Sequence, residues 1–329
     1  MTDIQGFKGT GSWYKGNIHG HTVISDGMLT PEESVKLYQE HGYSFQCFSE
    51  HDIFTDWREK FNTEKYIILP AVESSAVLYR AKGTNERYKI HHLHGILGTE
   101  KMQEEAKEGT FTHLQYIPPM KYFGTWDGKS VCQAVADNLT AHGCVLTYNH
   151  PIWSRVTEEE FIHVEGVSAL EIFNFNTVQE SNTGYDVTYW DRMLRIGKRI
   201  NAFASDDNHN EGLFEDSCGG WIMVQAPELT HEAIVQNFLD GNYYSSAGPE
   251  IYDWGVKDGT AYIDCSEVNH VNFVAGNIIN DGTTVLGKPC KNTVTHAEYR
   301  LKGHETYVRV EAVDCYGRTA WTNPIWLSW

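Results

Sequence analysis

The stretch Asn17-Ile18-His19-Gly20-His21-Thr22 decides how this chain is interpreted, because it sets two histidines one residue apart in a segment that has the pattern of a strand end. Side chains at positions i and i+2 of a strand point to the same side. His19 and His21 can therefore reach one point in space, as two imidazole ligands of one metal ion would. The pair alone is a weak signal, since the chain holds 16 histidines and close pairs arise by chance.

The composition describes a globular protein. A hydrophobic content of 41% over 329 residues allows a sizeable core, in one large domain plus a smaller one. Acidic residues outnumber Lys and Arg 44 to 26, and the resulting net charge of −18 disfavours a nucleic-acid partner, since that requires clustered cations. No apolar run approaches the roughly 20 residues that span a bilayer, and residues 1–11 lack the charged-then-apolar pattern of a signal peptide. We therefore expect no membrane partner.

The cysteines predict a reducing compartment. Seven are scattered along the chain without a CxxC pair or a repeated spacing. An odd, dispersed set is typical of reduced, buried thiols in a cytoplasmic protein, and a disulfide framework is disfavoured.

Strand-like and helix-like segments alternate up to about residue 245, which predicts βαβ units. Thr30-Pro31-Glu32-Glu33 has the residues of a helix start, with a capping threonine, a proline in the first turn and a capping-box glutamate. We expect residues 79–88 to form an excursion loop and residues 98–128 a loop or lid over the site. The expected helices cover residues 30–42, 130–142, 186–196 and 230–240, and the expected strands cover residues 43–48, 66–72, 90–98, 144–148, 169–173, 199–204 and 221–225.

The pattern changes near residue 245. Beyond it no helix pattern is visible, residues 306–313 alternate as a strand does, and Asp314 to Arg318 has the composition of a hairpin turn. The sequence thus predicts two domains, an alternating α/β domain over residues 1–245 and a small antiparallel, β-sandwich-like domain over residues 246–329.

Candidate metal ligands recur just past or within six of the strand-like segments. In a parallel β/α barrel such positions meet at one rim, where active sites are built from residues far apart in sequence. Each residue alone could be an ordinary polar residue at a strand end, but their recurrence favours one shared site. Imidazole suits Zn, Fe and Mn, carboxylates can bridge two ions, and the lack of thiolates at these places disfavours a structural zinc site. The candidates are His19, His21, His51, Glu73, His94, His150, Asp206 and His209.

Together with Asp26 and Ser49-Glu50-His51, these residues resemble the polymerase and histidinol phosphatase (PHP) superfamily of metal-dependent phosphoesterases. The resemblance covers about residues 13–245, and it includes Ser25-Asp26-Gly27 followed by the helix start at residue 30. The segment 244–249 and the Trp-Thr-Asn-Pro sequence near the end are similar to the subgroup that has a carboxy-terminal β domain and includes carbaryl-hydrolase-like enzymes.

The resemblance implies a distorted (β/α)7 barrel that holds two or three divalent ions, zinc, manganese or iron. It implies one ion held by His19, His21, Glu73 and Asp206, a second held by Glu73, His94 and His150, and a third held by Asp26, His51 and His209. Two departures stand out. Glu50 occupies a position where Asp is commoner, which we expect to be harmless, and the histidines at 91, 92 and 94 leave His92 as an alternative to His94.

The chemistry expected of such a site is hydrolysis of a small phosphate ester. Two cations bridged by a carboxylate lower the pKa of a shared water, and the resulting hydroxide attacks phosphorus in line. We expect Glu73 and His150 to take part in catalysis, and a further metal and nearby cations to stabilise the phosphoryl oxygens. Arg155 and Arg80 are candidates for that cationic clamp, although each could be a plain surface arginine.

Two other hypotheses remain open. An amide, carbamate or ester hydrolase would use the same hydroxide on a carbonyl carbon. A pocket rich in Arg and Lys would favour the phosphate ester, and an apolar pocket lined by Trp126, Trp153 and Phe175 would favour the carbonyl substrate. A non-catalytic protein that binds a carbohydrate or partner through its β domain would need a defective metal set, and no expected ligand is missing.

Overall fold

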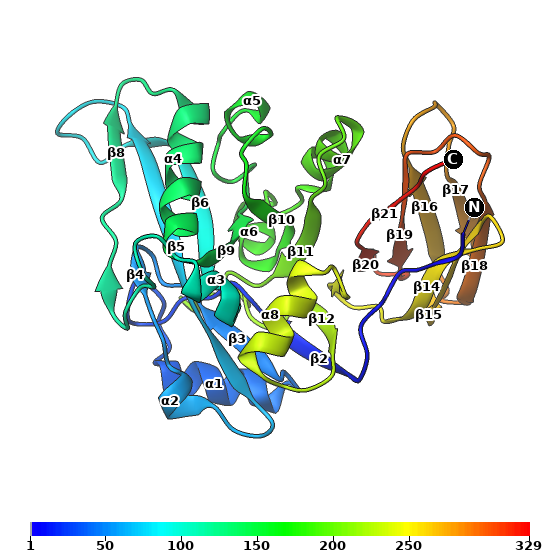
Figure 1. The fold of residues 1–329 in the computed structure, drawn as a ribbon, viewed down its shortest axis with the longest axis horizontal. Coiled ribbons are helices and arrows are strands. Elements are labelled where there is room, and N and C mark those ends of the chain that lie inside the picture. The colour runs from blue at the N-terminus through cyan, green and yellow to red at the C-terminus, as the bar shows by residue number, and fades with distance from the viewer. Residues whose placement is uncertain (1) are drawn as a thin grey trace.

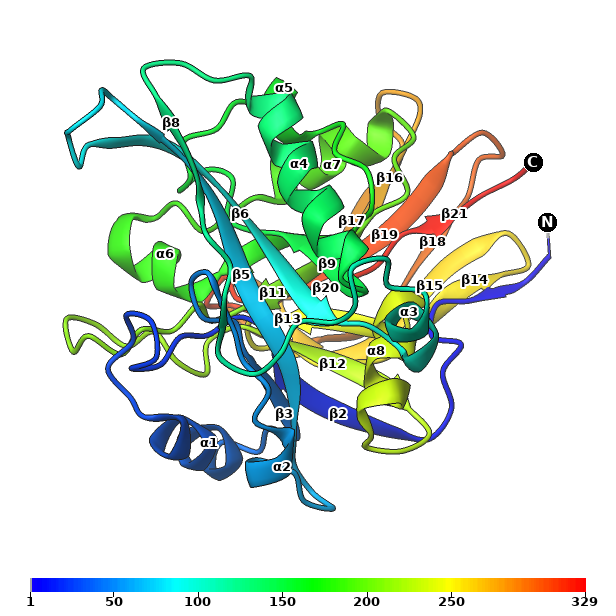
Figure 2. The same cartoon turned by 60° about the vertical axis from the view of Figure 1, so that its left-hand side comes forward.

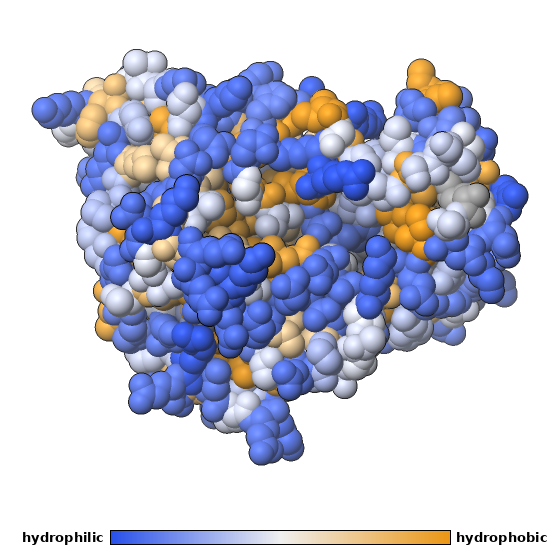
Figure 3. Space-filling model, viewed as in Figure 1, coloured by the Kyte–Doolittle hydropathy of each residue, from blue (hydrophilic) through white to orange (hydrophobic). Residues whose placement is uncertain are grey.

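The computed structural model describes residues 2–329 and shows a mixed α/β protein with two lobes. The larger lobe carries the helices, and the smaller lobe consists of strands and lies beside both chain ends (Figure 1). The face seen in Figure 3 is mostly hydrophilic, as expected from a net charge of −18. No helix within residues 2–329 is long and apolar enough to cross a membrane.

The larger lobe is built on a strongly mixed sheet whose strand order is β11-β10-β9-β6-β5-β3-β2-β12. Its strands are β2 (Ser12–Asn17), β3 (Phe45–Phe48), β5 (Ile67–Tyr79), β6 (Arg87–Leu97), β9 (Cys144–Tyr148), β10 (Val167–Asn174), β11 (Asn201–Ser205) and β12 (Trp221–Ala226). The runs β2-β3-β5 and β9-β10-β11 are parallel, while β6 is antiparallel to β5 and β9. No ladder joins β11 to β12 in the described chain, so the sheet is open and the expected (β/α)7 barrel is not shown.

Strands β5 and β6 form a long hairpin, and the sequence analysis ended its first strand too early. The expected strand ended at residue 72, but β5 continues through Glu73 to Tyr79, and Glu73 pairs with His94 in mid-strand. The segment after Glu73 supplies Val77, Leu78 and Tyr79, residue types that suit a pleated sheet. The expected excursion loop is therefore the turn of this hairpin.

The predicted helices are confirmed. They are α1 (Pro31–Glu40), α4 (Gly128–Ala141), α7 (Val187–Arg195) and α8 (His231–Leu239), and shorter helices are α2 (Arg58–Phe61), α3 (Glu100–Glu104), α5 (Glu158–Phe161) and α6 (Phe175–Ser181). Thr30 and Glu33 form the expected capping box at the start of α1. Helix α4 buries Val131, Val135 and Leu139, which helical spacing places on one face.

The segment 98–128 is more regular than the loop or lid that was expected. It contains α3 and two short strands, β7 (Gln115–Tyr116) and β8 (Met120–Phe123). Strand β7 pairs with β4 (Ile53–Phe54), and β8 runs parallel to the second half of β5. The end of this segment therefore widens the sheet beside the β5–β6 hairpin.

The smaller lobe is antiparallel throughout. One sheet has the order β1-β14-β15-β18, and the other continues the main sheet from β12 through β13, β20 and β19 to β16 and β17. The turn expected at residues 314–318 joins β19 to β20. Because β1 pairs with β14, the amino terminus belongs to this lobe, and the division at residue 245 stays a prediction. The bounds are β1 (Ile4–Gln5), β13 (Tyr243–Ser246), β14 (Ile251–Lys257), β15 (Thr260–Val268), β16 (His270–Ala275), β17 (Thr283–Leu286), β18 (Val294–Arg300), β19 (Tyr307–Val313), β20 (Thr319–Thr322) and β21 (Ile325–Trp326).

All seven cysteines are free thiols. Four of them are buried as expected, but Cys218 is half-buried and Cys290 and Cys315 are exposed. The expectation of buried thiols therefore holds for only part of the set.

Candidate metal centre

The Glu73 carboxylate lies at the centre of the candidate site. Glu73 points from the middle of β5 into the larger lobe and is fully buried. Six imidazole nitrogens approach its two oxygens: those of His51 at 2.9 Å, His19 at 3.2 Å, His92 and His150 at 3.3 Å, His21 at 3.6 Å and His94 at 4.0 Å. The predicted convergence of residues distant in sequence is therefore present, although it forms around mid-strand residues as well as strand ends.

Asp207, and not the predicted Asp206, joins this cluster. The Asp207 Oδ1 atom lies 2.9 Å from His19 Nε2 and 3.0 Å from His21 Nε2. Asp206 points the other way, where its carboxylate accepts hydrogen bonds from the backbone N–H groups of residues 218–220, at 2.8 Å each, and from the Tyr38 hydroxyl at 2.7 Å. The two aspartates follow β11, and the left-handed backbone of Asp207, with φ of 53°, turns its side chain away from the direction of Asp206.

His92 and His94 both face Glu73, because they are separated by one residue on β6. His91 points to the other face, where its Nδ1 lies 2.6 Å from the Tyr148 hydroxyl and its ring stacks on Trp126. The sequence left open whether His92 or His94 is the ligand, and in the structure both are available. We call Glu73, His19, His92, His94, His150 and Asp207 the Glu73 group.

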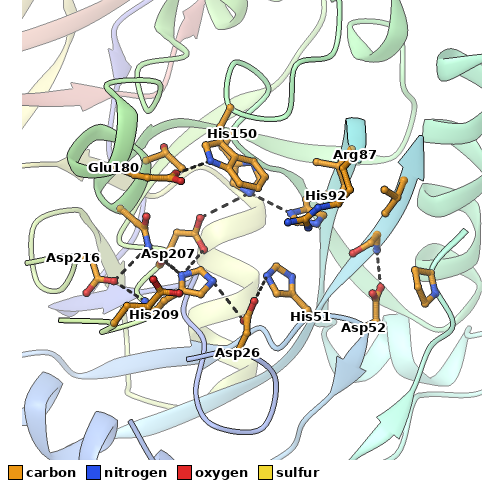
Figure 4. A pocket seen from close by; sticks show the side chains of 18 of the residues that line it. Asp26, His51, Asp52, Arg87, His92, His150, Glu180, Asp207, His209 and Asp216 are labelled. Carbon is orange, nitrogen blue, oxygen red and sulfur yellow. Dashed lines mark hydrogen bonds and ion pairs between the residues drawn. The ribbon is translucent and has the colours of Figure 1, made fainter. Parts of the chain in front are cut away.

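A second set of donors gathers around Asp26. The Asp26 oxygens lie 3.5 Å from His51 Nε2, 3.5 Å from His209 Nε2 and 4.0 Å from His21 Nδ1 (Figure 4). We call Asp26, His21, His51 and His209 the Asp26 group. The His21 and His51 rings stand between the two groups, since each also faces Glu73.

Glu50 holds the loop that carries Asp26. Its buried carboxylate accepts hydrogen bonds from the backbone N–H groups of Thr22 at 3.1 Å and Ser25 at 3.2 Å, and from the hydroxyls of both residues. Glu50 lies outside the donor groups, in agreement with the expectation that it is not a ligand. Its hydrogen bonds instead fix the loop that carries Asp26 next to these groups.

The sequence analysis missed Glu171, which contacts His19 on the side of its ring that faces away from Glu73. Its carboxylate accepts hydrogen bonds from His19 Nδ1 at 2.8 Å and from the backbone N–H of His150 at 3.0 Å. A histidine whose Nδ1 donates to a carboxylate turns the lone pair of Nε2 outward, here toward Glu73 and Asp207. The one signal in the sequence was a charged residue inside the apolar strand 169–173.

The electrostatics of the cluster favour ionised carboxylates and divide the imidazoles into some whose pKa is raised, as for His19, His51 and His150, and some whose pKa is lowered, as for His21, His92 and His94. Burial acts to raise the pKa of Glu73, but the neighbouring rings of His92 and His19 hold it well below its usual value. Burial, with the nearby rings of His51 and His209, lowers the pKa of His21 to about 3. Burial also disfavours the charged form of His51, yet Glu73 and Asp26 raise its pKa to about 9.

The residues present fit divalent metal ions. Three buried atoms, His51 Nδ1, Glu73 Oε2 and His94 Nε2, have no hydrogen-bond partner, although the first two lie only 2.9 Å apart. Native proteins rarely leave such atoms unpaired. Five sets of three or four His, Asp or Glu donors have their ligand atoms within 4.8 Å of one another. Imidazole and carboxylate together are donors for zinc, manganese or iron.

A cavity of about 420 Å³ opens above the cluster (Figure 4). His51, His92, His150, Asp207 and His209 form its inner end, and Trp153, Arg87 and Lys121 line it further out. The predicted clamp residues are not among the lining residues: Arg155 is exposed, and Arg80 pairs with Glu86 at 2.9 Å. Of the three aromatic residues expected for a carbonyl substrate, only Trp153 lines the cavity.

The comparisons with known proteins find remote likeness in fold. No family model matches the chain, and no curated protein matches it. Among solved structures, a two-domain protein from Bacteroides vulgatus, described as containing a predicted PHP-like metal-dependent phosphoesterase, is 12% identical with a TM-score of 0.46, over 95% of this chain and 93% of that one.

Two further solved structures align with this chain over most of their own length. A candidate metal-dependent phosphoesterase from Bifidobacterium adolescentis is 17% identical with a TM-score of 0.39, over 60% of this chain and 88% of that one. An amidohydrolase from Chromobacterium violaceum, with bound sulfate and no metal, is 12% identical with a TM-score of 0.39, over 69% of this chain and 96% of that one. These descriptions match the PHP resemblance of the sequence, but likeness this remote carries no argument about activity, which depends on the site.

Proposed function

We propose that this protein is a metal-dependent hydrolase of small phosphate esters. The observation that carries the proposal is the fully buried Glu73 carboxylate with six imidazole nitrogens within 4.0 Å, three of the buried donor atoms being unpaired. A protein that used these residues only for packing would leave polar atoms unsatisfied at a cost of about 1–3 kcal/mol each. The complete donor set also argues against a non-catalytic binding protein.

The proposed ligands differ from the sequence prediction in two residues. Asp207 replaces Asp206, and His92 joins His94. The full set is His19, His21, Asp26, His51, Glu73, His92, His94, His150, Asp207 and His209, which would hold two or three divalent ions of zinc, manganese or iron. Such ions, when bound, supply an acidified water and polarise the ester that it attacks.

The charge of the donors favours a phosphate. Only three carboxylates, those of Asp26, Glu73 and Asp207, stand among the proposed ligands. Glu171, which bonds to His19, adds a fourth carboxylate, so that two divalent ions would balance the carboxylate charge and three would leave a net positive site, which suits the negative charge spread over phosphoryl oxygens. Glu171 orients His19, and the cavity gives the substrate a way in to the buried donors. Arg155 has no place in this proposal, because it lies outside the cavity.

A metal-dependent amide, carbamate or ester hydrolase is the second candidate. It is favoured by the apolar part of the cavity lining, to which Trp153, Val77 and Ile90 contribute. The absence of Trp126 and Phe175 from the lining weakens it. A cytoplasmic location stays a prediction from the sequence.

Elemental analysis combined with an activity screen tests the proposal. We expect two or three equivalents of Zn, Mn or Fe in the purified protein, and hydrolysis of aryl phosphates but not of aryl carbamates. Glu73→Gln should lose most of the metal and lower kcat/KM by on the order of a thousandfold. Arg155→Met, the matched control on the nearby surface, should keep both its metal and its kcat/KM. Metal-replete protein that is inert to phosphate esters but cleaves carbamates would transfer the assignment to the second candidate.

A further inference from the structure

One wall of the cavity is a sheet that extends well beyond the metal cluster. Figure 2 shows β5 and β6 as a long ribbon that leaves the body of the lobe, with β8 alongside. Side chains at alternate positions of β5 share a face, and after Glu73 the residues Ser75, Val77 and Tyr79 all line the cavity. The cavity therefore follows the strand outward from the cluster.

Two cations stand on this wall. Lys121 of β8 pairs in register with Val77, and Arg87 of β6 pairs with Tyr79. Arg87 reaches the cavity side because the β5–β6 ladder shifts register between Leu78 and Tyr79, a bulge that turns one residue to the other face. Both side chains line the cavity.

These cations lie too far along the strand to hold a group that is bound at Glu73. A strand rises about 3.3 Å per residue, so Val77 is about 13 Å and Tyr79 about 20 Å from Glu73 along the strand. Between the two places the lining includes the polar Ser75 and Asp52 nearer the cluster and the apolar Val77, Ile90 and Pro119. Arg87 and Lys121 could thus meet only a part of the substrate distant from the reacting centre.

Neither cation is neutralised by the protein. Within residues 2–329, Arg87 and Lys121 have no ion-pair partner, whereas Lys89 on the same strand pairs with Glu160 at 2.7 Å. Three acidic residues of the outer cavity are occupied by other groups: on the sheet side Asp52 accepts a hydrogen bond from the backbone N–H of Ser75 at 2.8 Å, while Glu180 accepts from Trp153 at 2.7 Å and Asp216 accepts from the backbone N–H groups of His209 and Asn210. Two free positive charges therefore face the cavity from its sheet side.

From this arrangement we infer that the substrate is elongated and carries a second anionic group, a carboxylate or a further phosphate, on the order of 10 Å from the bond that is cleaved. Arg87 and Lys121 bind that distal group, and the apolar wall contacts the spacer. This inference rests on the proposed function for the reaction, but it concerns residues outside the donor groups. Arg87 and Lys121 are specificity-determining residues here and take no part in the bond cleavage.

The test compares aryl phosphates that differ only at the distal end. The probes are phenyl phosphate, 3-(4-phosphonooxyphenyl)propionic acid, its neutral propionamide, and the analogue with a terminal phosphate in place of the carboxylate. With wild-type protein we expect kcat/KM for the acid to exceed that for the amide by roughly five- to tenfold, since solvent-open charge pairs contribute modestly. The double variant Arg87→Met/Lys121→Met should lose this preference through KM and keep its activity on phenyl phosphate. Comparison of the acid with the terminal phosphate tells which anion is preferred.

Two further measurements make the outcome decisive. Arg80→Met, which removes an exposed arginine of the same hairpin from outside the cavity, should keep the preference. Calorimetry with the phosphonate analogues of the acid and the amide measures the same preference without turnover. If no phosphate ester is cleaved but the acid phosphonate still binds more tightly, and the double variant loses that difference, the phosphoesterase proposal fails and the distal-anion site stands. Equal binding of acid and amide, or a preference that survives in the double variant, overturns the inference.

Discussion

The two donor groups of the candidate centre are built differently. Half of the Glu73 group sits on strands β5 and β6 and half just past strand ends, and Glu73, His19 and His94 are fully buried. The Asp26 group sits mainly on loops at the cavity, where the side chains of Asp26, His51 and His209 are 54%, 26% and 17% exposed. Buried ligands that are fixed by their neighbours hold an ion more firmly than exposed ones. The comparison predicts a firmly held metal position in the Glu73 group and an exchangeable one in the Asp26 group.

Among the variants that distinguish the two donor groups, the largest effect should come from Asp207 of the Glu73 group, which contacts the rings of His19 and His21. Asp207→Asn removes a negative charge from the cluster, and we expect loss of metal and a fall in kcat/KM of about a hundredfold or more. Metal analysis and steady-state kinetics on phenyl phosphate measure both.

Asp206→Asn is the matched control, because it changes the neighbouring aspartate in the same way. An amide cannot accept all the hydrogen bonds that the Asp206 carboxylate takes from residues 218–220 and Tyr38. We expect this variant to keep its metal while the free energy of unfolding falls by about 1–3 kcal/mol. If Asp206→Asn loses the metal and Asp207→Asn keeps it, the assignment of the two residues is wrong.

An intermediate effect is expected when the Asp26 group is weakened. Asp26→Asn should remove one equivalent of metal, leave the ions of the Glu73 group in place, and lower kcat/KM by about 10- to 100-fold. In wild-type protein a chelator should remove the same equivalent first, which metal analysis at increasing chelator concentration would detect. Asp137→Asn, an exposed aspartate on α4, serves as the control. Simultaneous release of all the ions would mean that the two groups do not differ.

Local patterns predicted much of this arrangement. The spacing of His19 and His21, the capping box at Thr30 and Glu33, and the helical stripe of α4 each depend on residues close in sequence. Such features follow from strand and helix periodicity, and the structure has them where the sequence placed them.

The features that were missed depend on contacts between distant segments. The choice between Asp206 and Asp207 is made as the chain leaves β11, where Asp207 takes the left-handed conformation with φ of 53°, and no local pattern encodes that turn. Arg87 reaches the cavity through a bulge set by pairing with β5. Glu171 was passed over because its partners, His19 and His150, lie on other strands.

The smallest effect, and the sharpest test of the comparison, concerns Glu50. Glu50→Asp installs the residue that is commoner in the resembled family but shortens the side chain by one methylene. The shorter carboxylate cannot reach both Thr22 and Ser25 as Glu50 does, so the loop that carries Asp26 should loosen. An aspartate keeps the carboxylate and can keep the hydrogen bonds to one of the two residues, and we therefore expect the ion of the Asp26 group to bind only about three- to tenfold more weakly. Chelator titration should show this shift for the first equivalent alone, and amide hydrogen exchange should quicken at residues 22–26. Glu33→Asp, which shortens a carboxylate in the capping box of α1, should leave both measurements unchanged. An equal loss from the Glu73 group would show that the loop and the buried strands respond as one unit, and the distinction between a firmly held and an exchangeable position would fall.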